Sequence, residues 1–135
     1  MADNGLARFQ HRMAAIPKAA RAAVKPALVK GADEIAGAAR RLAPVDSGDL
    51  RASIAVTGPG ETTPPYSQPG GRRTLTELQA AVTAGDSKVR YAHLVEFGTE
   101  HTQPQPYFWP AFRSYRKRAA NRIKRAISKA IKDAR

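Results

Sequence analysis

The strongest constraint on the fold is the spacing of apolar side chains near the two ends of the chain. Steps of three and four residues dominate in both places: Leu6, Phe9, Met13, Ile16, Leu28, Ala32, Ile35, Ala39 and Leu42 in the first part, and Ala119, Ile123, Ile127, Ala130, Ile131 and Ala134 in the last. Such spacing is typical of amphipathic helices. The sequence therefore predicts a long helix at each end.

Two prolines interrupt the first of these runs. Pro17 and Pro26 each lack the amide hydrogen that a helix interior uses, and each ring crowds the carbonyl four residues back. We therefore expect a break or a kink at both, which makes residues 1–25 an N-terminal helical extension. Pro26 could instead open a fresh helix. That helix ends near Leu42, because the residue before Pro44 avoids helical geometry.

The middle of the chain predicts a small sheet. Residues 50–56 lead into a strand-like segment, and residues 75–84 alternate apolar with polar side chains as a half-buried strand does. Between them, residues 58–74 are rich in Gly, Pro and Thr, which predicts a mobile loop or one that only a partner orders. Gly85 and Asp86 then form a turn.

A length of 135 residues suits one domain, residues 1–135, of the α+β class. We expect a small, mostly antiparallel sheet flanked by the long N-terminal helix and by a basic C-terminal helix over residues 113–135. Hydrophobic residues make up 42%, but many are Ala, so partners could complete the burial of a core with few bulky side chains. The absence of Cys and of any signal-peptide or bilayer-spanning run predicts a soluble protein that stays inside the cell, without a membrane partner.

The net charge of +12 is concentrated in the last helix. A cationic face fits contact with DNA phosphates, docking on an acidic protein surface, or a solvated face that only keeps the protein soluble. The candidate residues for docking or nucleic-acid contact are Arg116, Arg122, Lys124, Arg125, Lys129 and Lys132.

The stretch from Tyr91 to Phe112 raises the question of a metal or catalytic site. His93, Glu96 and His101 lie close in sequence, but their spacing differs from that of zinc-binding helix motifs, and no second carboxylate is well placed. We therefore expect no catalytic, metal-binding or cofactor-binding residue. The carboxylate of Glu96, set between apolar neighbours, needs a partner that offsets its desolvation. That partner is either an N–H group or a cation, which Arg40, Arg51 or Arg90 could supply.

Prolines fix the backbone around several aromatic rings in the same stretch. Rings held in this way are good anchors, so Tyr107, Phe108 and Trp109, with Tyr66 of the loop, are candidate interface residues. The alternative is that the rings close the core of the domain under the last helix. For Phe108 the two interpretations weigh equally, whereas for Trp109 we favour the interface.

Three sequence blocks occur in order along the chain: LAPVDSGDLRASI, YAHLVEFGT and PQPYFWPAF. Together they resemble the small neck or tail-component proteins of long-tailed bacteriophages and prophages. The first block has a local interpretation, in which Asp46 or Ser47 caps backbone N–H groups and Gly48 relieves crowding. The motif residues with an expected structural role are Asp46, Ser47, Gly48, Leu50, Ser53, Tyr91, Glu96, Phe97, Gly98 and Thr99.

The resemblance implies assembly and not catalysis. Such proteins help join head and tail as a ring around the DNA channel, and we expect six copies rather than twelve. The implied partners are connector or stopper proteins, tail-terminator or tail-tube proteins, and possible DNA in the channel. The implied location is the neck or tail of the virion, after assembly in the host cytoplasm.

Two further expectations concern the basic helix. Since DNA must slide through such a channel, we expect the helix to dock on protein in preference to DNA. The alternative function is a sequence-nonspecific, basic DNA-binding protein that acts as a monomer or dimer and binds duplexes in a salt-sensitive way.

Overall fold

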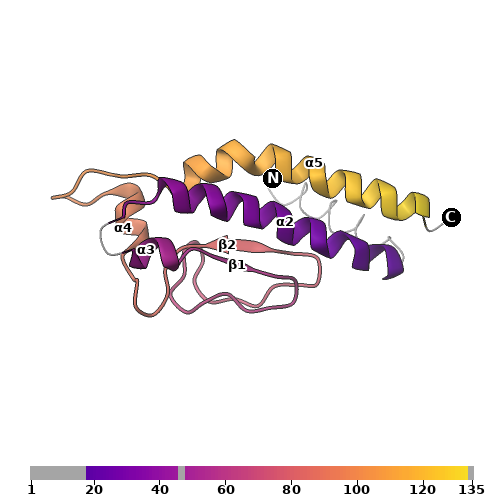
Figure 1. Cartoon of the computed structure of the whole chain (residues 1–135). Coiled ribbons are helices and arrows are strands. Elements are labelled where there is room, and N and C mark those ends of the chain that lie inside the picture. The colour runs from indigo at the N-terminus through magenta and orange to yellow at the C-terminus, as the bar shows by residue number, and fades with distance from the viewer. Residues whose placement is uncertain (1–17, 46–47, 134–135) are drawn as a thin grey trace, which may run out of the picture.

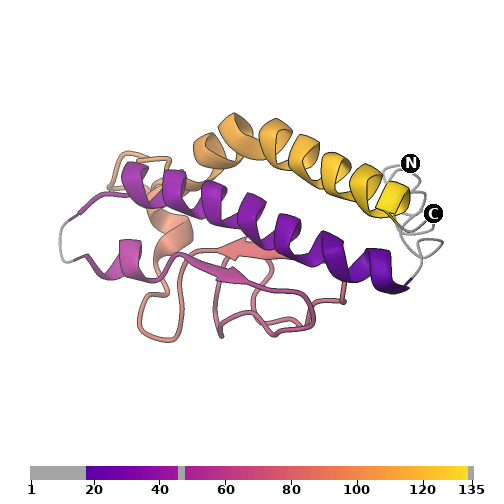
Figure 2. The ribbon, with the colours of Figure 1, turned by 45° about the vertical axis from the view of Figure 1, so that its right-hand side comes forward.

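The computed structural model describes residues 18–45 and 48–133. Its two long helices, α2 (Lys18–Leu42) and α5 (Phe108–Asp133), lie antiparallel and side by side (Figure 1). The strands lie on the other side of α2, so α2 forms the middle of three layers (Figure 2). Long helices from the two ends of the sequence therefore pack against each other, as an α+β domain with a small sheet.

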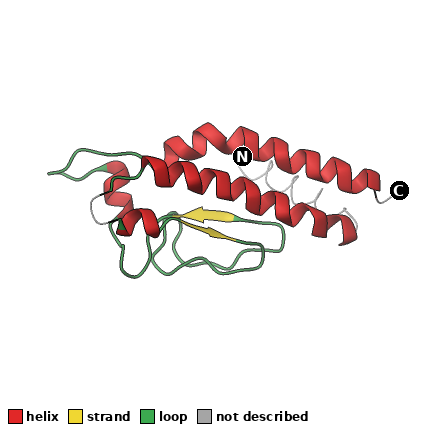
Figure 3. Cartoon of the chain, in the orientation of Figure 1, coloured by secondary structure: helices red, strands yellow, loops and turns green. Residues whose placement is uncertain are grey.

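The sheet is a single antiparallel pair, shown in yellow in Figure 3. Strand β1 (Ala55–Thr57) pairs with strand β2 (Ala81–Thr83), with Val56 opposite Val82. The strand expected over residues 75–84 is shorter than predicted. The side-chain oxygen of Gln79 accepts the Thr76 N–H at 3.0 Å, and this local turn occupies the chain before β2 begins.

Residues 58–74, expected to be a loop, form hydrogen bonds within the segment and with the residue after β2. Thr63 donates its N–H to the Arg73 carbonyl at 2.8 Å, and Thr63 is buried. Gln68 exchanges both backbone hydrogen bonds with Ala84, the residue after β2. The sequence did not reveal this arrangement, because these contacts join residues ten or more positions apart.

Helix α2 continues through Pro26 without a break, so the described part of the expected extension, residues 18–25, belongs to α2 itself. Pro26 cannot donate to Ala22, but both residues are exposed, so water can satisfy the Ala22 carbonyl. The idea that Pro26 opens a new helix is therefore wrong. Pro17 and the apolar residues before it lie outside the described residues.

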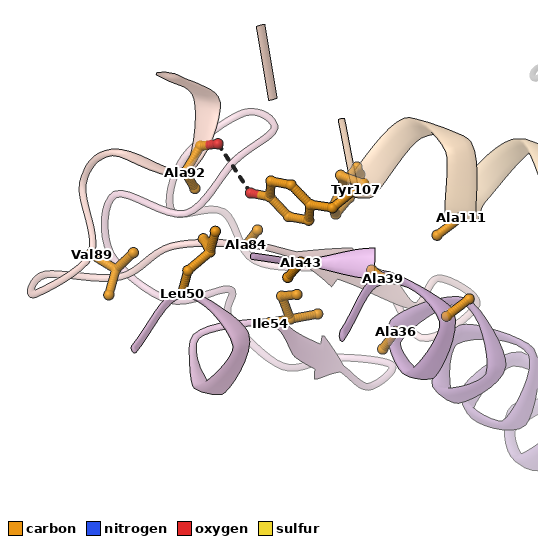
Figure 4. Close-up of a cluster of buried hydrophobic side chains, with 12 residues drawn as sticks. Ala36, Ala39, Ala43, Leu50, Ile54, Ala84, Val89, Ala92, Tyr107 and Ala111 are labelled. Carbon is orange, nitrogen blue, oxygen red and sulfur yellow. Dashed lines mark hydrogen bonds between the residues drawn. The ribbon is translucent and has the colours of Figure 1, made fainter. Parts of the chain in front are cut away.

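Two short helices stand at the end of the molecule where α2 finishes (Figure 1). These are α3 (Asp49–Ala52) and α4 (Ala92–Phe97). The main core lies where they meet the long helices, and it is built largely from Ala around a few larger side chains such as Leu50, Ile54 and Tyr107 (Figure 4). A smaller cluster of Val24, Leu28 and Ala130 joins the other ends of α2 and α5.

The contact between α2 and α5 depends on small residues. A Cβ atom added to Gly31 would lie 3.0 Å from the Cβ of Ala119, so the two backbones approach closely at this point. Glu34 of α2 binds Arg122 of α5 through a salt bridge, and its second oxygen lies 3.5 Å from Arg118. Close approach and charge pairing together fix the register of the two helices.

Replacing Gly31 by Leu is expected to destabilise the fold by about 1–3 kcal/mol, because the new side chain must push α5 away from α2. Replacing Gly37 by Ala is the matched control within the same helix. An added Cβ there meets only the end of Arg41, at 3.6 Å, so this change should stabilise the protein by about 0.5–1 kcal/mol. Urea unfolding followed by circular dichroism measures both, and a neutral Gly31→Leu variant would contradict the close helix contact.

Candidate functional site

The carboxylate of Glu96 holds the start of α5. Glu96 lies on α4 and is buried, with 6% of its surface exposed. Its Oε1 accepts the backbone N–H groups of Tyr107 at 3.0 Å and Phe108 at 2.8 Å, and its Oε2 accepts that of Trp109 at 3.3 Å. We call this arrangement the Glu96 clamp.

The clamp explains why α5 begins at Phe108 and not near Arg113 as expected. The first N–H groups of a helix have no partner inside the helix. Glu96 accepts the free N–H groups before Pro110, and Pro110 has none to offer. The negative charge also interacts favourably with the positive end of the helix dipole. A single side chain therefore satisfies the whole helix start.

Backbone N–H groups, and not a cation, are the partners of Glu96. Each of the three arginines considered from the sequence has another contact. Arg40 donates to the Ile54 carbonyl at 2.8 Å, Arg51 donates weakly to that of Ala43 at 3.5 Å, and the guanidinium of Arg90 lies 3.8 Å from the ring centre of Tyr66. The carboxylate is thus desolvated but well compensated by hydrogen bonds.

Tyr107 adds a second tie between α4 and α5. Its hydroxyl donates to the Ala92 carbonyl at 3.0 Å (Figure 4), and the residue is only 1% exposed. Burial raises the pKa of the Tyr107 phenol well above its usual range, and the nearby Glu96 charge raises it further. Tyr107 and Phe108 are therefore core residues, which agrees with the alternative that these rings close the core of the domain.

Gly98 ends α4 in a backbone conformation that essentially only glycine adopts, with φ 77° and ψ 175°. An added Cβ would lie 2.8 Å from both the Thr102 carbonyl oxygen and the Pro104 nitrogen. Thr99 and Thr102 exchange backbone hydrogen bonds just beyond it, and the Thr99 hydroxyl accepts the His101 N–H. The loop from Thr99 to Pro106 is exposed and projects beyond the helices (Figure 1).

The first motif block joins α3 to the turn after β2. The hydroxyl of Ser53 donates to the Leu50 carbonyl at 2.6 Å and accepts the Gly85 N–H at 3.0 Å. Leu50 is a core residue, and Gly48 precedes α3 with φ 83°. Asp46 and Ser47 lie outside the described residues, so the expected cap stays a prediction.

Large apolar side chains are exposed around α4. Phe97 is 66% exposed and Leu94 is 43% exposed, although both flank the buried Glu96. Tyr91 before α4, and Leu42 and Val45 where α2 ends, are also exposed at this end of the molecule. We call these five residues the end patch: Leu42, Val45, Tyr91, Leu94 and Phe97. Exposed large apolar side chains at one end of a domain are candidates for burial by a protein partner.

Trp109 lines two apolar hollows beside α5. One hollow, of about 320 Å³, lies between α2, β2 and α5, and the other, of about 280 Å³, lies against α4. The rings of Phe108, Trp109 and Phe112 pack edge to face, with centroids 5.3 and 5.7 Å apart. Trp109 is half-buried and Tyr66 is exposed, so both stay candidate interface residues.

The basic residues of α5 divide into two groups. Arg122 is partly buried in its salt bridge with Glu34, so an acid of the domain itself already compensates its charge. The remaining candidates are exposed: Arg116, Lys124, Arg125, Lys129 and Lys132. Sequence reasoning missed the α2 partner of Arg122 because Glu34 lies far away along the chain.

Histidines 93 and 101 are both exposed. Across residues 18–45 and 48–133, no three His, Cys, Asp or Glu side chains gather as metal ligands would. In the same part of the chain, every helix is too short or too polar to cross a bilayer.

These features define a small α+β domain whose rigid corner between α4 and α5 presents an apolar surface. Residues 7–98 match the model of a family described as "Bacteriophage HK97-gp10, putative tail-component". The match covers more than half of the chain, so the chain belongs to this family of phage tail components, which implies a structural and not an enzymatic role. Searches of curated proteins and of solved structures gave no match.

Replacing Glu96 by Ala is expected to destabilise the protein by about 3 kcal/mol or more, because each buried N–H without an acceptor costs about 1–3 kcal/mol. Glu96→Gln keeps one acceptor oxygen and should lose about 1–2 kcal/mol. The exposed Glu100→Ala change on the following loop is the control and should cost about 0.5 kcal/mol or less. Equal urea midpoints for Glu96→Ala and Glu100→Ala would contradict the clamp.

Replacing Gly98 by Ala tests the close packing after α4. Gly71 is the control, because it also has a positive φ, of 67°, but nothing within 4 Å of an added Cβ. Gly71→Ala should suffer only backbone strain of about 1 kcal/mol, whereas Gly98→Ala adds a collision worth about 1–3 kcal/mol. Thermal unfolding of the two variants measures the difference, and identical losses would argue against the crowded turn.

Proposed function

We propose that this tail component is a ring-forming subunit at the phage neck or tail-completion position, where it joins head and tail around the DNA channel. The observation that carries the proposal is the end patch. A monomer gains nothing from exposing Phe97 and Leu94 on a helix that the Glu96 clamp holds in place. A neighbouring subunit that covers these side chains would stabilise both partners.

The family model supports this assignment because it describes a phage tail component. The Ala-rich core supports it as well, since small side chains bury little apolar area each and leave the domain dependent on contacts outside it. The ring has six copies in this proposal, and its neighbours are a connector or stopper on one side and a tail-terminator or tail-tube protein on the other. The subunits assemble in the host cytoplasm and remain in the virion.

A contact between different surfaces of successive subunits is what closes a ring. The end patch supplies one such surface. The hollow between α2, β2 and α5 offers apolar surface elsewhere on the domain. The second hollow adjoins the end patch, because Phe97 is part of its lining. Rigid presentation at a corner lowers the ordering cost of association, because α4 is already fixed before the partner arrives.

Light scattering of the purified protein tests the proposal. The wild type should form one discrete oligomer of ring size at low and high salt, with or without duplex DNA. Phe97→Ser and Leu94→Ser in one chain should weaken association at least about tenfold, since buried apolar anchors contribute about 1 kcal/mol or more each. At a protein concentration low enough for both proteins to be monomeric, the urea midpoint of this double variant should stay near that of the wild type, because both side chains are exposed in the monomer.

The matched control is Ile131→Ser, which removes an exposed apolar side chain of α5 outside the end patch. It should leave the oligomer intact. A monomer at every protein concentration, even with neighbouring tail proteins present, would overturn the ring. A monomer that grows only when DNA is added at low salt would favour the DNA-binding alternative.

A further inference from the structure

The outward face of α5 is positively charged along its length. Every charged residue of the helix is basic until Asp133 at its last position. The buried side is formed by Phe108, Ala111, Ala119 and Ala130, which contact the rest of the domain. The basic residues away from that side are exposed: Arg113, Arg116, Lys117, Arg118, Lys124, Arg125, Lys129 and Lys132.

These cations form rows along the helix. Residues seven apart lie on nearly the same face and about 10.5 Å along the axis. Lys117 and Lys124 form one row, and Arg118, Arg125 and Lys132 form another. Between the two rows, at the same spacing, stand the small polar residues Ser114, Asn121 and Ser128.

We call this surface the basic strip: Lys117, Arg118, Asn121, Lys124, Arg125 and Lys132. Lys117, Arg118, Asn121 and Arg125, together with Ser114, line one shallow polar hollow on the surface of α5. The rows therefore border a common depression and do not point away from each other.

The domain itself neutralises little of this charge. Both salt bridges found among the described residues use the single carboxylate of Glu34, on the α2 side of the helix. Arg118 stays 66% exposed despite its contact with Glu34. The basic strip is thus held on a helix that packs firmly against α2, with its charges open to solvent.

The residue types of the basic strip favour a phosphate-bearing partner over a protein partner. Protein interfaces have apolar or aromatic centres and are depleted in Lys. Within the described part of α5, the exposed large apolar side chain is Ile131, and no aromatic ring joins the strip. The end patch has the character of a protein-binding surface, whereas the strip has the clustered cations and small hydrogen-bonding groups that phosphates attract.

We propose that the basic strip binds the phosphates of duplex DNA without reading the base sequence. This extends the proposed function by naming a partner, and it replaces the sequence-based expectation that the helix docks on protein. Phosphate contacts by flexible Lys and Arg side chains are individually weak and are the same at each step along a duplex. DNA can therefore shift past such a surface without losing favourable contacts.

Fluorescence anisotropy of a labelled duplex, with the full-length protein in whatever oligomer it forms, tests the proposal. Binding should be equal for AT-rich and GC-rich duplexes and should weaken between about 50 mM and about 200 mM salt. The test variant carries Lys117→Gln, Lys124→Gln and Arg125→Gln. It should lower affinity at least about tenfold and reduce the slope of log affinity against log salt by about one for each phosphate that the variant no longer neutralises.

The control carries Lys30→Gln, Arg72→Gln and Lys88→Gln. It removes the same charge from exposed sites on α2 and in two loops. It should bind DNA within about threefold of the wild type, since none of these three residues belongs to α5, which carries the strip. Equal losses in both variants would overturn the proposal, because net charge alone would then explain binding.

Two other results would also overturn it: no DNA binding at about 50 mM salt, or binding of polyglutamate in place of DNA, which would return the strip to an acidic protein partner. The oligomer mass of both variants is measured in parallel. An intact ring that does not bind DNA refutes only the proposal that the basic strip binds DNA. A monomer that binds DNA through the strip refutes only the proposal that the protein forms a ring.

Discussion

The hydrogen bonds between the Glu96 carboxylate and the start of α5 are the contacts on which the rest of this corner depends. They fix where α5 begins, they require α4 to lie with Glu96 inward, and they leave Leu94 and Phe97 on the outside. Gly98 is then needed, because the chain must leave α4 through a space too small for a side chain. The exposure of Leu94 and Phe97 on α4 is thus a direct consequence of the inward position of the Glu96 carboxylate.

The two long helices show a second division of roles. Small residues on the inner side, Gly31 and Ala119, allow a close approach, and Glu34 joins α2 to the inner edge of the basic face. Because small residues and one acid make the contacts between α2 and α5, the residues on the outer side of α5 are not needed for packing. They can therefore carry uncompensated positive charge. Different surfaces of one small domain can therefore attract different partners, apolar at the end patch and anionic along the strip.

Much of the fold could be predicted from spacing alone. The apolar steps of three and four residues indicated both long helices, and the turn at Gly85 was visible as Gly-Asp. Two kinds of feature could not be predicted from the sequence: contacts between residues far apart along the chain, and local sequence signals that the structure overrides. Pro26 is tolerated because it faces solvent, the 58–74 loop is held by bonds between distant residues, and the short α4 was not predicted although Ala92 and Glu96 lie one helical turn apart. For Glu96, local sequence indicated the need for a partner, but not that the partner was the next helix.

The pairing of α2 with α5 also affects how the chain folds during synthesis. Helix α2 precedes the sheet and α5 along the chain, so the side that packs on α5 has no cover until α5 has been made. The contact between Gly31 and Ala119 spans most of the chain, so it closes late and at a high loop-closure cost. Until then, the nascent chain exposes the apolar stripe of α2, and rapid synthesis of α5 or transient cover by a chaperone would protect it from aggregation.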